Sequence, residues 1–401
     1  MDKLINYVND KLFVEILQLS HLKFDQLQEV QNCQIVNQCL FLTEKSYNQS
    51  FSNRTNFKFL IAPNLQIVHN TMFQDSTLEL AFIPELLQIE NGHNIEGQIC
   101  GAFSNSNLRQ IQFSKLKSVG DFAFRGCRIS NLQEVDLPLC SEIGRASFSH
   151  CLLESVSLPN LQLLHNSSFA NCLLKEVFLP NLTKIDDWAF SGNKLLRNVT
   201  FQQVEEVAKS SFQNCELLQE IDFPKLILVS ERAFLGCQLK QLDLKFVTKI
   251  GEYAFSNCRN LQFVKLLNLQ ELEERAFNNC INLEGVEMPL VQKIGKKAFC
   301  NCQKLEKISL NLIQIVPDEL FLHCTSLKEV EMQNAIEVGT NCYSLCDKIE
   351  KISCQLSAGA FICCYGDCVR EKGCVVCTQA IQGCLEARQR IEKEEESNIL
   401  M

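Results

Sequence analysis

Cysteine is the most regularly placed chemically reactive residue in this sequence. The chain contains 23 cysteines in 401 residues, and eleven of them form a series in which each stands three residues after a regularly spaced aromatic residue. The series consists of Cys127, Cys151, Cys172, Cys215, Cys237, Cys258, Cys280, Cys302, Cys324, Cys346 and Cys364, with Asn193 taking the same place once. Thiolates at fixed intervals are suited to disulfide formation, metal binding or redox chemistry.

The even spacing argues against disulfides within this series. If each interval is one coil of a stacked structure, neighbouring cysteines point the same way, with Cβ atoms ~4.8 Å apart. A disulfide needs Cβ atoms that converge to ~3.5–4.5 Å. We therefore expect free, buried thiols that fill space and donate weakly to backbone carbonyls. Abundant reduced cysteine is also typical of cytosolic chains.

A second cysteine cluster lies near the C-terminus, at Cys364, Cys368, Cys374 and Cys377. Four thiolates close together are what a structural zinc site uses, but the intervening loop is shorter than in common zinc modules. Three interpretations stay open: a C-terminal cap with free thiols, a zinc site, or disulfides. We favour the cap and so predict no metal and no cofactor.

Other catalytic motifs are absent from the sequence. None of the six histidines stands in a His-Glu-x-x-His motif, and there is no Gly-x-Ser-x-Gly, phosphate loop or dinucleotide fingerprint. His150, His165 and His323 fall at repeat turns, where we expect solvated or locally bonded imidazoles. The sequence therefore predicts no catalytic residues and no enzyme.

The elements that position these residues follow from a second periodic feature, a small residue followed by phenylalanine. The aromatic series contains Phe103, Phe124, Phe148, Phe169, Phe190, Phe212, Phe234, Phe255, Phe277 and Phe299, with Phe73, Phe321, Tyr343 and Phe361 extending it. From Phe103 to Phe299 the spacing is 21 or 22 residues, apart from one interval of 24. Such a period is typical of leucine-rich repeats.

Each repeat also contains a segment that predicts a short strand. Leu-x-x-Val-x-Leu-Pro occurs with Leu153, Val156 and Leu158, and again from Leu174 to Pro180. The alternation turns two side chains inward, and the proline lacks the amide that a continuing ladder needs. One repeat cannot bury its apolar side alone, so successive strands must pair in parallel and the phenylalanines must lie over one another.

This arrangement resembles the BspA-type leucine-rich-repeat family, also called the Treponema-type repeat, whose repeats run Ala-Phe-x-x-Cys-x-x-Leu-x-x-Val-x-Leu-Pro. The resemblance covers about residues 57 to 364. It implies a leucine-rich-repeat solenoid of stacked short parallel β-strands with turn or irregular connections. Bacterial members are commonly surface proteins that bind host or partner proteins, so the resemblance also implies protein binding.

The repeats divide the chain into three parts. Residues 1–50 have apolar residues at helical spacing, including Leu4, Val8 and Leu12, and predict a helical N-terminal cap, with a partner-binding helix as the alternative. Residues 51–364 form a solenoid of about 13 repeats, with extra chain between Ile89 and Phe103 that predicts a projecting loop. Residues 365–401 predict a cysteine-rich cap, a short helix and a charged tail.

Composition restricts the function classes. The chain is 46% hydrophobic and 21% charged with a net charge of −9, which is ordinary for a folded chain and speaks against nucleic acid as the main ligand. No apolar run approaches the ~18 residues of a membrane span, and no secretory signal is readable at the N-terminus. We therefore expect a cytoplasmic, monomeric protein, with the cell surface, reached by an unreadable route, as the alternative.

The functional surface is predicted at the outward positions of the strands. These are Asp136, Ser157, Phe178, Thr200, Asp222, Asp243, Lys265, Glu287, Ser309 and Glu331, and beside them Glu134, Ser155, Glu176, Asn198, Glu220, Gln241, Phe263, Gly285, Lys307 and Glu329. Acidic residues predominate, and two exposed aromatics are typical of interface anchors.

From these positions we select Phe178, Phe263, Glu176, Glu220, Asp222 and Asp243 as partner-binding candidates. The function predicted is a non-catalytic protein-interaction scaffold that presents this strip to a basic partner. The alternative function is an exported or cell-surface recognition or adhesion protein, and scattered solvated residues are the plain alternative for the strip itself.

Overall fold

The computed structural model describes residues 2–95, 97–129 and 135–354 and divides into two compact units. Unit 1 consists of Met1–Val204 with Asn214–Leu217, and unit 2 of Glu205–Gln213 with Leu218–Met401. The cysteine cluster from Cys364 to Cys377, the short C-terminal helix and the charged tail lie outside the described residues, as does Glu134.

Unit 1 begins with three short helices: η1 (Asp2–Tyr7), α1 (Lys11–Leu19) and η2 (Phe24–Glu29). The Asp10 carboxylate accepts a hydrogen bond from the amide of Phe13 at 3.0 Å and so caps α1. Phe13 and Ile16 are buried on the apolar face of α1, and the Phe13 ring lies 5.0 Å from that of Phe82. The helices thus cover the first coils, which confirms the helical character predicted for this end.

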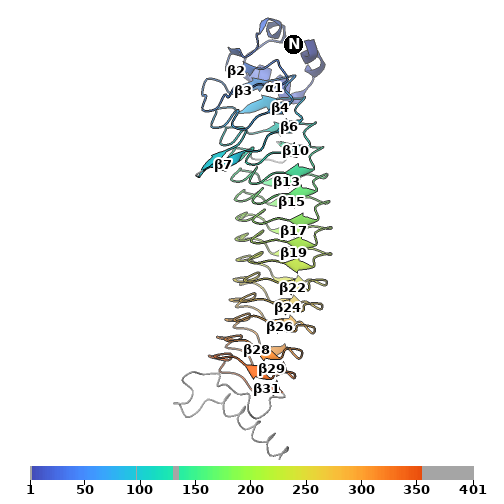
Figure 1. Cartoon of the computed structure of the whole chain (residues 1–401), viewed down its shortest axis with the longest axis vertical. Helices are drawn as coiled ribbons and strands as arrows, with labels where there is room; N and C mark the ends of the chain where they lie inside the picture. Colours follow the sequence, from blue (N-terminus) through green and yellow to red (C-terminus); the bar gives the residue numbers. More distant parts are fainter. Residues whose placement is uncertain (1, 96, 130–134, 355–401) are drawn as a thin grey trace, which may run out of the picture. The chain divides into compact units, whose positions relative to one another are not determined.

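Most coils of unit 1 contribute a first strand and a second strand (Figure 1). The first strands are β2 (Cys39–Phe41), β3 (Phe59–Ile61), β5 (Leu80–Phe82), β9 (Ile111–Gln112), β11 (Val135–Asp136), β13 (Ser155–Ser157), β15 (Glu176–Phe178) and β17 (Asn198–Thr200), preceded by β1 (Ile35–Val36). The second strands are β4 (Ile67–Val68), β6 (Gln88–Ile89), β10 (Ser118–Val119), β12 (Glu142–Ile143), β14 (Leu163–Leu164) and β16 (Lys184–Ile185).

Pairing between coils in unit 1 is parallel, as predicted. Ser157 pairs with Phe178 on the first strands, and Glu142 pairs with Leu163 on the second strands. Parallel pairing already begins between β2 and β3, and the antiparallel β1–β2 pair precedes it. The sequence did not predict the second strands. They are only two residues long, so no alternation is visible in them.

The extra chain before Phe103 forms a hairpin of β7 (His93–Ile95) and β8 (Gln98–Cys100), paired antiparallel. Gly97 in its turn has a φ of 85°, a conformation that glycine adopts without a Cβ clash. The hairpin reaches out beyond the neighbouring coils, at the label β7 in Figure 1. The predicted projecting loop is therefore confirmed, and it has a regular structure of its own.

Unit 2 repeats the same coil in an unbroken series. Its first strands are β19 (Glu220–Asp222), β21 (Gln241–Asp243), β23 (Phe263–Lys265), β25 (Gly285–Glu287), β27 (Lys307–Ser309), β29 (Glu329–Met332) and β31 (Lys351–Cys354). Its second strands are β18 (Glu206–Val207), β20 (Leu228–Val229), β22 (Lys249–Ile250), β24 (Glu271–Leu272), β26 (Lys293–Ile294), β28 (Ile315–Val316) and β30 (Glu337–Val338). The pairs β21–β23–β25 and β18–β20–β22–β24–β26 are all parallel.

A column of aromatic rings forms the centre of each unit. In unit 1 successive rings from Phe51 to Phe190 are stacked with centroids 5.2–5.8 Å apart. In unit 2 those from Phe212 to Tyr343 are 5.3–6.0 Å apart. The rings are almost completely buried. The prediction that phenylalanines one repeat apart lie over one another is confirmed within each unit.

The turn around each phenylalanine needs left-handed backbone at two places, two residues before the ring and two residues after it. In one coil these are Tyr253, with a φ of 55°, and Asn257, with a φ of 61°. The later place is filled mostly by glycine, asparagine or histidine, the residues that adopt this conformation most readily. His150 and His323 stand there, with φ values of 61° and 64°.

Candidate functional site

The periodic cysteines bond backbone carbonyls. In ten coils the Sγ atom lies 3.0–3.4 Å from the carbonyl oxygen of the phenylalanine one coil earlier, in pairs such as Cys127 with Phe103 and Cys258 with Phe234. Asn193 replaces the thiol with an amide, whose Nδ2 donates to the Phe169 carbonyl at 2.8 Å. The predicted thiol-to-carbonyl contact is thus confirmed.

Burial also removes the reactivity of these thiols. It raises the pKa of Cys127, Cys172 and Cys280 to about 12. Since the thiolate is the form that attacks electrophiles and binds metals, these side chains stay inert near neutral pH. No group of three or more His, Cys, Asp or Glu side chains suited to a metal occurs in residues 2–95, 97–129 and 135–354. The proposed zinc ligands from Cys364 to Cys377 fall outside that range.

The environment of His165 and His150 is local to the turns on which they lie. His165 Nε2 lies 2.9 Å from Glu142 Oε1 on the preceding coil, which agrees with the expected locally bonded imidazole. Burial first, and then the Arg125 charge, lower the pKa of His150, which favours its neutral form.

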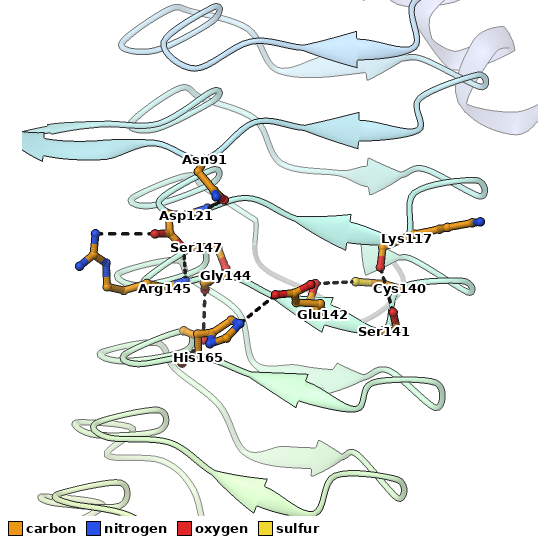
Figure 2. A network of polar contacts seen from close by, with 11 residues as sticks. Asn91, Lys117, Asp121, Cys140, Ser141, Glu142, Gly144, Arg145, Ser147 and His165 are labelled. Atoms are coloured by element: carbon orange, nitrogen blue, oxygen red, sulfur yellow. Dashed lines mark hydrogen bonds and ion pairs between the residues drawn. The ribbon is translucent and has the colours of Figure 1, made fainter.

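A polar groove of about 530 Å³ lies in unit 1, and the sequence did not predict it. It is lined by residues at or just after the second strands, among them Asn91, Asp121, Arg145 and His165. Figure 2 shows that its polar contacts step from one coil to the next. Aligning the repeats on phenylalanine would have placed these side chains in neighbouring coils, but it would not have shown a hollow.

Coil-to-coil contacts satisfy the polar groups of this groove. Asp121 Oδ1 accepts the backbone amide of Arg145 at 2.7 Å, and the amide of Asp121 donates to Asn91 Oδ1 at 3.1 Å (Figure 2). The other carboxylate oxygen of Asp121, Oδ2, lies 3.6 Å from the Arg145 guanidinium. These contacts tie successive coils together, and they resemble a structural ladder more than a reaction centre.

The outward side chains of the first strands make the more distinctive surface. In unit 2, Phe263 is 52% exposed at the start of β23, where it pairs with Gln241 on one side and Gly285 on the other. A Cβ placed on Gly285 would stand 3.0 Å from Phe263 Cδ1, so the ring leans over this glycine. Because Gly285 has no side chain, the exposed Phe263 ring can lie over the backbone of the neighbouring strand.

Charged residues surround this ring. On the other outward row of the same strands, Lys265 pairs with Asp243 and with Glu287, and its Nζ lies 3.9 Å from Glu287 Oε2. We call Gln241, Asp243, Phe263, Lys265, Gly285 and Glu287 the Phe263 patch. Glu220 and Asp222 are exposed on β19 of the same unit.

The remaining candidates lie in unit 1. Phe178 is 57% exposed on β15, beside Ser157 on the neighbouring strand, and Glu176 is exposed on the same strand. All six selected residues are therefore outward and exposed, but they belong to separate units. The structure groups Asp243 with Phe263 in unit 2, and Glu176 with Phe178 in unit 1.

Comparison with protein families identifies the class of repeat. Residues 99–203, 141–262 and 248–364 match the BspA type leucine rich repeat region, with six copies. Because these residues make up more than half of the chain, the protein belongs to the BspA-type leucine-rich-repeat family. No curated protein matches the chain.

Solved structures of leucine-rich repeat proteins match this chain at low identity. A leucine-rich repeat protein from Bacteroides ovatus is 19% identical, with 72% of this chain and 86% of that chain covered and a TM-score of 0.49. One from Eubacterium ventriosum is 16% identical, covering 62% and 74%, with a TM-score of 0.39. A leucine rich cell surface protein from Faecalibacterium prausnitzii is 18% identical, covering 80% and 91%, with a TM-score of 0.33.

Membrane insertion through a helix finds no support in the part of the chain that the structure describes. None of its helices combines the length and the apolar character that crossing a bilayer requires.

Proposed function

We propose that this protein is a non-catalytic, monomeric interaction scaffold that binds a protein partner through its first-strand face. One observation carries the proposal: Phe263 lies with half of its surface in solvent, on a regular strand, over a glycine. The core does not need an aromatic side chain there, because Val264 points inward from the same strand and is buried. Exposed aromatic anchors with a charged surround are typical of protein interfaces.

The charges of the face favour a basic partner. In unit 2, Glu220, Asp222, Asp243 and Glu287 are all exposed on first strands, whereas Lys265 is drawn toward Glu287. A surface with an excess of carboxylates raises the association rate with basic proteins, and this effect weakens as salt is added. Phe178 and Glu176 supply a second acidic and aromatic contact in unit 1.

The test is affinity capture with the intact chain as bait. Partners captured from native lysate at low salt should be lost with the variant Phe263→Ser, and Asp243→Asn should weaken their capture. Leu163→Ser is the matched control, because Leu163 is 54% exposed but lies on a second strand of unit 1. Capture that survives Phe263→Ser and Asp243→Asn unchanged, or that is equally lost with Leu163→Ser, would contradict the proposed face.

We propose a cytoplasmic location, and the state of the periodic cysteines supports it. The ten periodic cysteines of the described coils are buried, and their thiols donate to carbonyl groups one coil earlier. A reducing compartment maintains such thiols. The cell surface is the alternative location. Microscopy of a tagged chain separates the two, and a glycan on Asn48, which is exposed, would demonstrate export.

A further inference from the structure

The polar groove of unit 1 lies between two rows of side chains that run from coil to coil. One row begins the second strands and the other lies two residues beyond their ends, and they consist of Gln88, Ser118 and Glu142, and of Asn91, Asp121, Arg145 and Asn166. Between the rows, the residue directly after the second strand is glycine in two consecutive coils, Gly120 and Gly144. The coils on either side have Glu90 and His165 at this place. A stretch without side chains therefore separates two polar walls.

The groove is long enough for a chain of several units. Its lining residues come from five successive coils, from Gln88 to Asp186. Paired strands stand ~4.8 Å apart, so four steps extend about 19 Å along the coils. The volume of about 530 Å³ is in the range of ligand-binding clefts. An extended ligand therefore fits this groove better than a single small molecule.

The charges in and beside the groove compensate one another. Each of the three carboxylates in the lining lies close to a basic group, in the pairs Asp121–Arg145, Glu142–His165 and Asp186–Lys184, at 3.6, 2.9 and 3.9 Å. Figure 2 shows the first two of these pairs on opposite walls. A polyanion would meet three carboxylates and a single arginine, and a polycation would have to compete with the basic partners already present. The pairing favours a ligand without net charge.

Hydrogen-bonding capacity remains on both walls. Within the part of the chain that the structure describes, no contact engages the side chains of Gln88 and Ser118, Asn91 Nδ2 or Glu142 Oε2. Amide and hydroxyl side chains both donate and accept, and a carboxylate oxygen accepts. Since a hydroxyl group also does both, a ligand rich in hydroxyl groups is complementary to these walls.

Apolar ligands and extended peptides fit the groove less well. The apolar lining residues Ile89 and Val119 are only 3% and 2% exposed, so they offer no pocket for an apolar side chain. The Gly144 amide donates to the Val119 carbonyl at 2.8 Å, and the Gly144 carbonyl accepts the Ser147 amide at 3.4 Å. This backbone is already paired, so a peptide cannot add to it as a further strand.

An exposed aromatic ring belongs to the last turn of the groove. Trp188, the single tryptophan, lies two residues after Asp186 and is 36% exposed. The two preceding coils have the small residues Ala146 and Ser167 at the equivalent place. A broad aromatic face offers apolar contact area to the C–H side of a sugar ring, while the hydroxyl groups of the sugar stay on polar partners.

We propose that the groove of unit 1 binds an uncharged oligosaccharide. The sugar chain lies between the two walls, and its hydroxyl groups bond to Gln88, Ser118 and Glu142 on one side and to Asn91 on the other. This site belongs to a different unit from the Phe263 patch and binds a different class of ligand, so it goes beyond the proposed protein-binding function.

The probes are three uncharged hexasaccharides that differ in sugar and linkage: maltohexaose, laminarihexaose and chitohexaose. Calorimetry measures their binding to the intact chain. We expect at least one of them to bind saturably with a Kd below about 1 mM, and to change the fluorescence of Trp188. A heparin hexasaccharide and hexalysine are the charged controls and should bind at least about tenfold more weakly. The proposal is overturned if no uncharged probe binds, or if either charged control binds as tightly as the best of them.

The variant that tests the groove is the double change Gln88→Leu with Ser118→Leu. It removes hydrogen-bonding groups from one wall and installs the residue that another coil already has at this strand position, Leu163. The coils are therefore expected to stay folded, which circular dichroism checks. Glu142→Leu is the second variant if the first one unfolds. Glu337→Leu is the matched control, since Glu337 is exposed at the same strand position in unit 2.

We expect the double variant to weaken binding of the best hexasaccharide by about tenfold and Glu337→Leu to leave it unchanged. Unchanged binding by the folded double variant overturns the proposal, because the sugar then binds elsewhere. Phe263→Ser should not change hexasaccharide binding, so this proposal and the function proposed for the Phe263 patch can fail separately.

Discussion

Unit 1 and unit 2 contain the same coil but differ in almost everything outside its core. Both have a column of aromatic rings less than about 6 Å apart and cysteines bonded to the carbonyl one coil earlier. Unit 1 has N-terminal helices, the β7–β8 hairpin and a polar groove. Unit 2 has an uninterrupted series of coils and the Phe263 patch.

This difference shows which positions a repeat protein holds constant. An inward side chain packs against the equivalent side chain on each of the two neighbouring coils, so both contacts restrict which residue fits there. The stability of the core is therefore close to a sum of contacts between neighbouring coils. Outward side chains have no such constraint. Function is therefore expected where the outward positions depart from the repeat's own pattern, as at Phe263.

The largest effect is expected from truncating the aromatic column. Phe148→Ala in unit 1 and Phe255→Ala in unit 2 should each destabilise by about 3–5 kcal/mol, because each leaves a cavity between two stacked rings. Urea unfolding measures the loss, with circular dichroism reporting on the whole chain and the fluorescence of Trp188, the single tryptophan, reporting on unit 1. A loss below about 1 kcal/mol in one unit would show that the columns are not equivalent.

Asn193→Ala should be the next most harmful change. Asn193 is completely buried, its Nδ2 donates to two carbonyl groups at 2.8 Å, and its Oδ1 accepts the Leu174 amide at 3.2 Å. Removing the Asn193 side chain leaves these buried backbone groups without the hydrogen bonds that it provides, at a cost of about 1–3 kcal/mol. Asn193→Cys restores the donor that the other coils use and should cost less. If both variants unfold at the same urea concentration, the carbonyl bond is not what stabilises the coil.

Replacing the glycine that follows a second strand should lower the stability of the fold by a similar amount in both units. A Cβ on Gly144 would lie 2.8 Å from the amide nitrogen of Asp121, and one on Gly251 would lie 2.7 Å from that of Glu231. We expect Gly144→Ala and Gly251→Ala to destabilise by about 1–3 kcal/mol each, because backbone must move. Gly285→Ala is the control, since it meets only the movable Phe263 ring. Thermal unfolding of all three variants checks this order.

The smallest effect on stability is expected from removing one charge on the second strands of unit 2. Lys293, and then Lys249, hydrogen-bond to the Glu271 carboxylate and lower its pKa. Because the pKa of Glu271 is lower in the folded chain than in the unfolded chain, the ionised carboxylate stabilises the fold at any pH above the unfolded pKa. This stabilisation is lost as the pH falls through the pKa of the folded state. Glu271→Gln should therefore cost less than about 1 kcal/mol at about pH 7 and nothing at about pH 2. A cost that persists in acid would indicate packing and not charge.

The sequence predicts the inward half of this structure well. A side chain that recurs every 21 or 22 residues must meet its own copy, so the aromatic column and the parallel first strands follow from spacing alone. The thiol contacts follow too, because a buried Cys has few other partners. The exposure of Phe178 and Phe263 was predictable from the strand alternation.

The outward half was not predictable for physical reasons. A second strand of two residues, such as Lys249–Ile250, has no alternation to detect. The seat of Phe263 depends on a glycine in the next coil, Gly285, and the groove depends on how coils are staggered in space.

The β7–β8 hairpin indicates where the chain accepts foreign sequence. It leaves the coil after Ile89 and returns before Phe103, yet the rings of Phe73 and Phe103 still lie 5.2 Å apart. Inserted residues at this junction are therefore accommodated without parting the rings on either side. An epitope tag or a cleavable linker in place of the hairpin tip is thus a practical route to labelling this protein at an internal site.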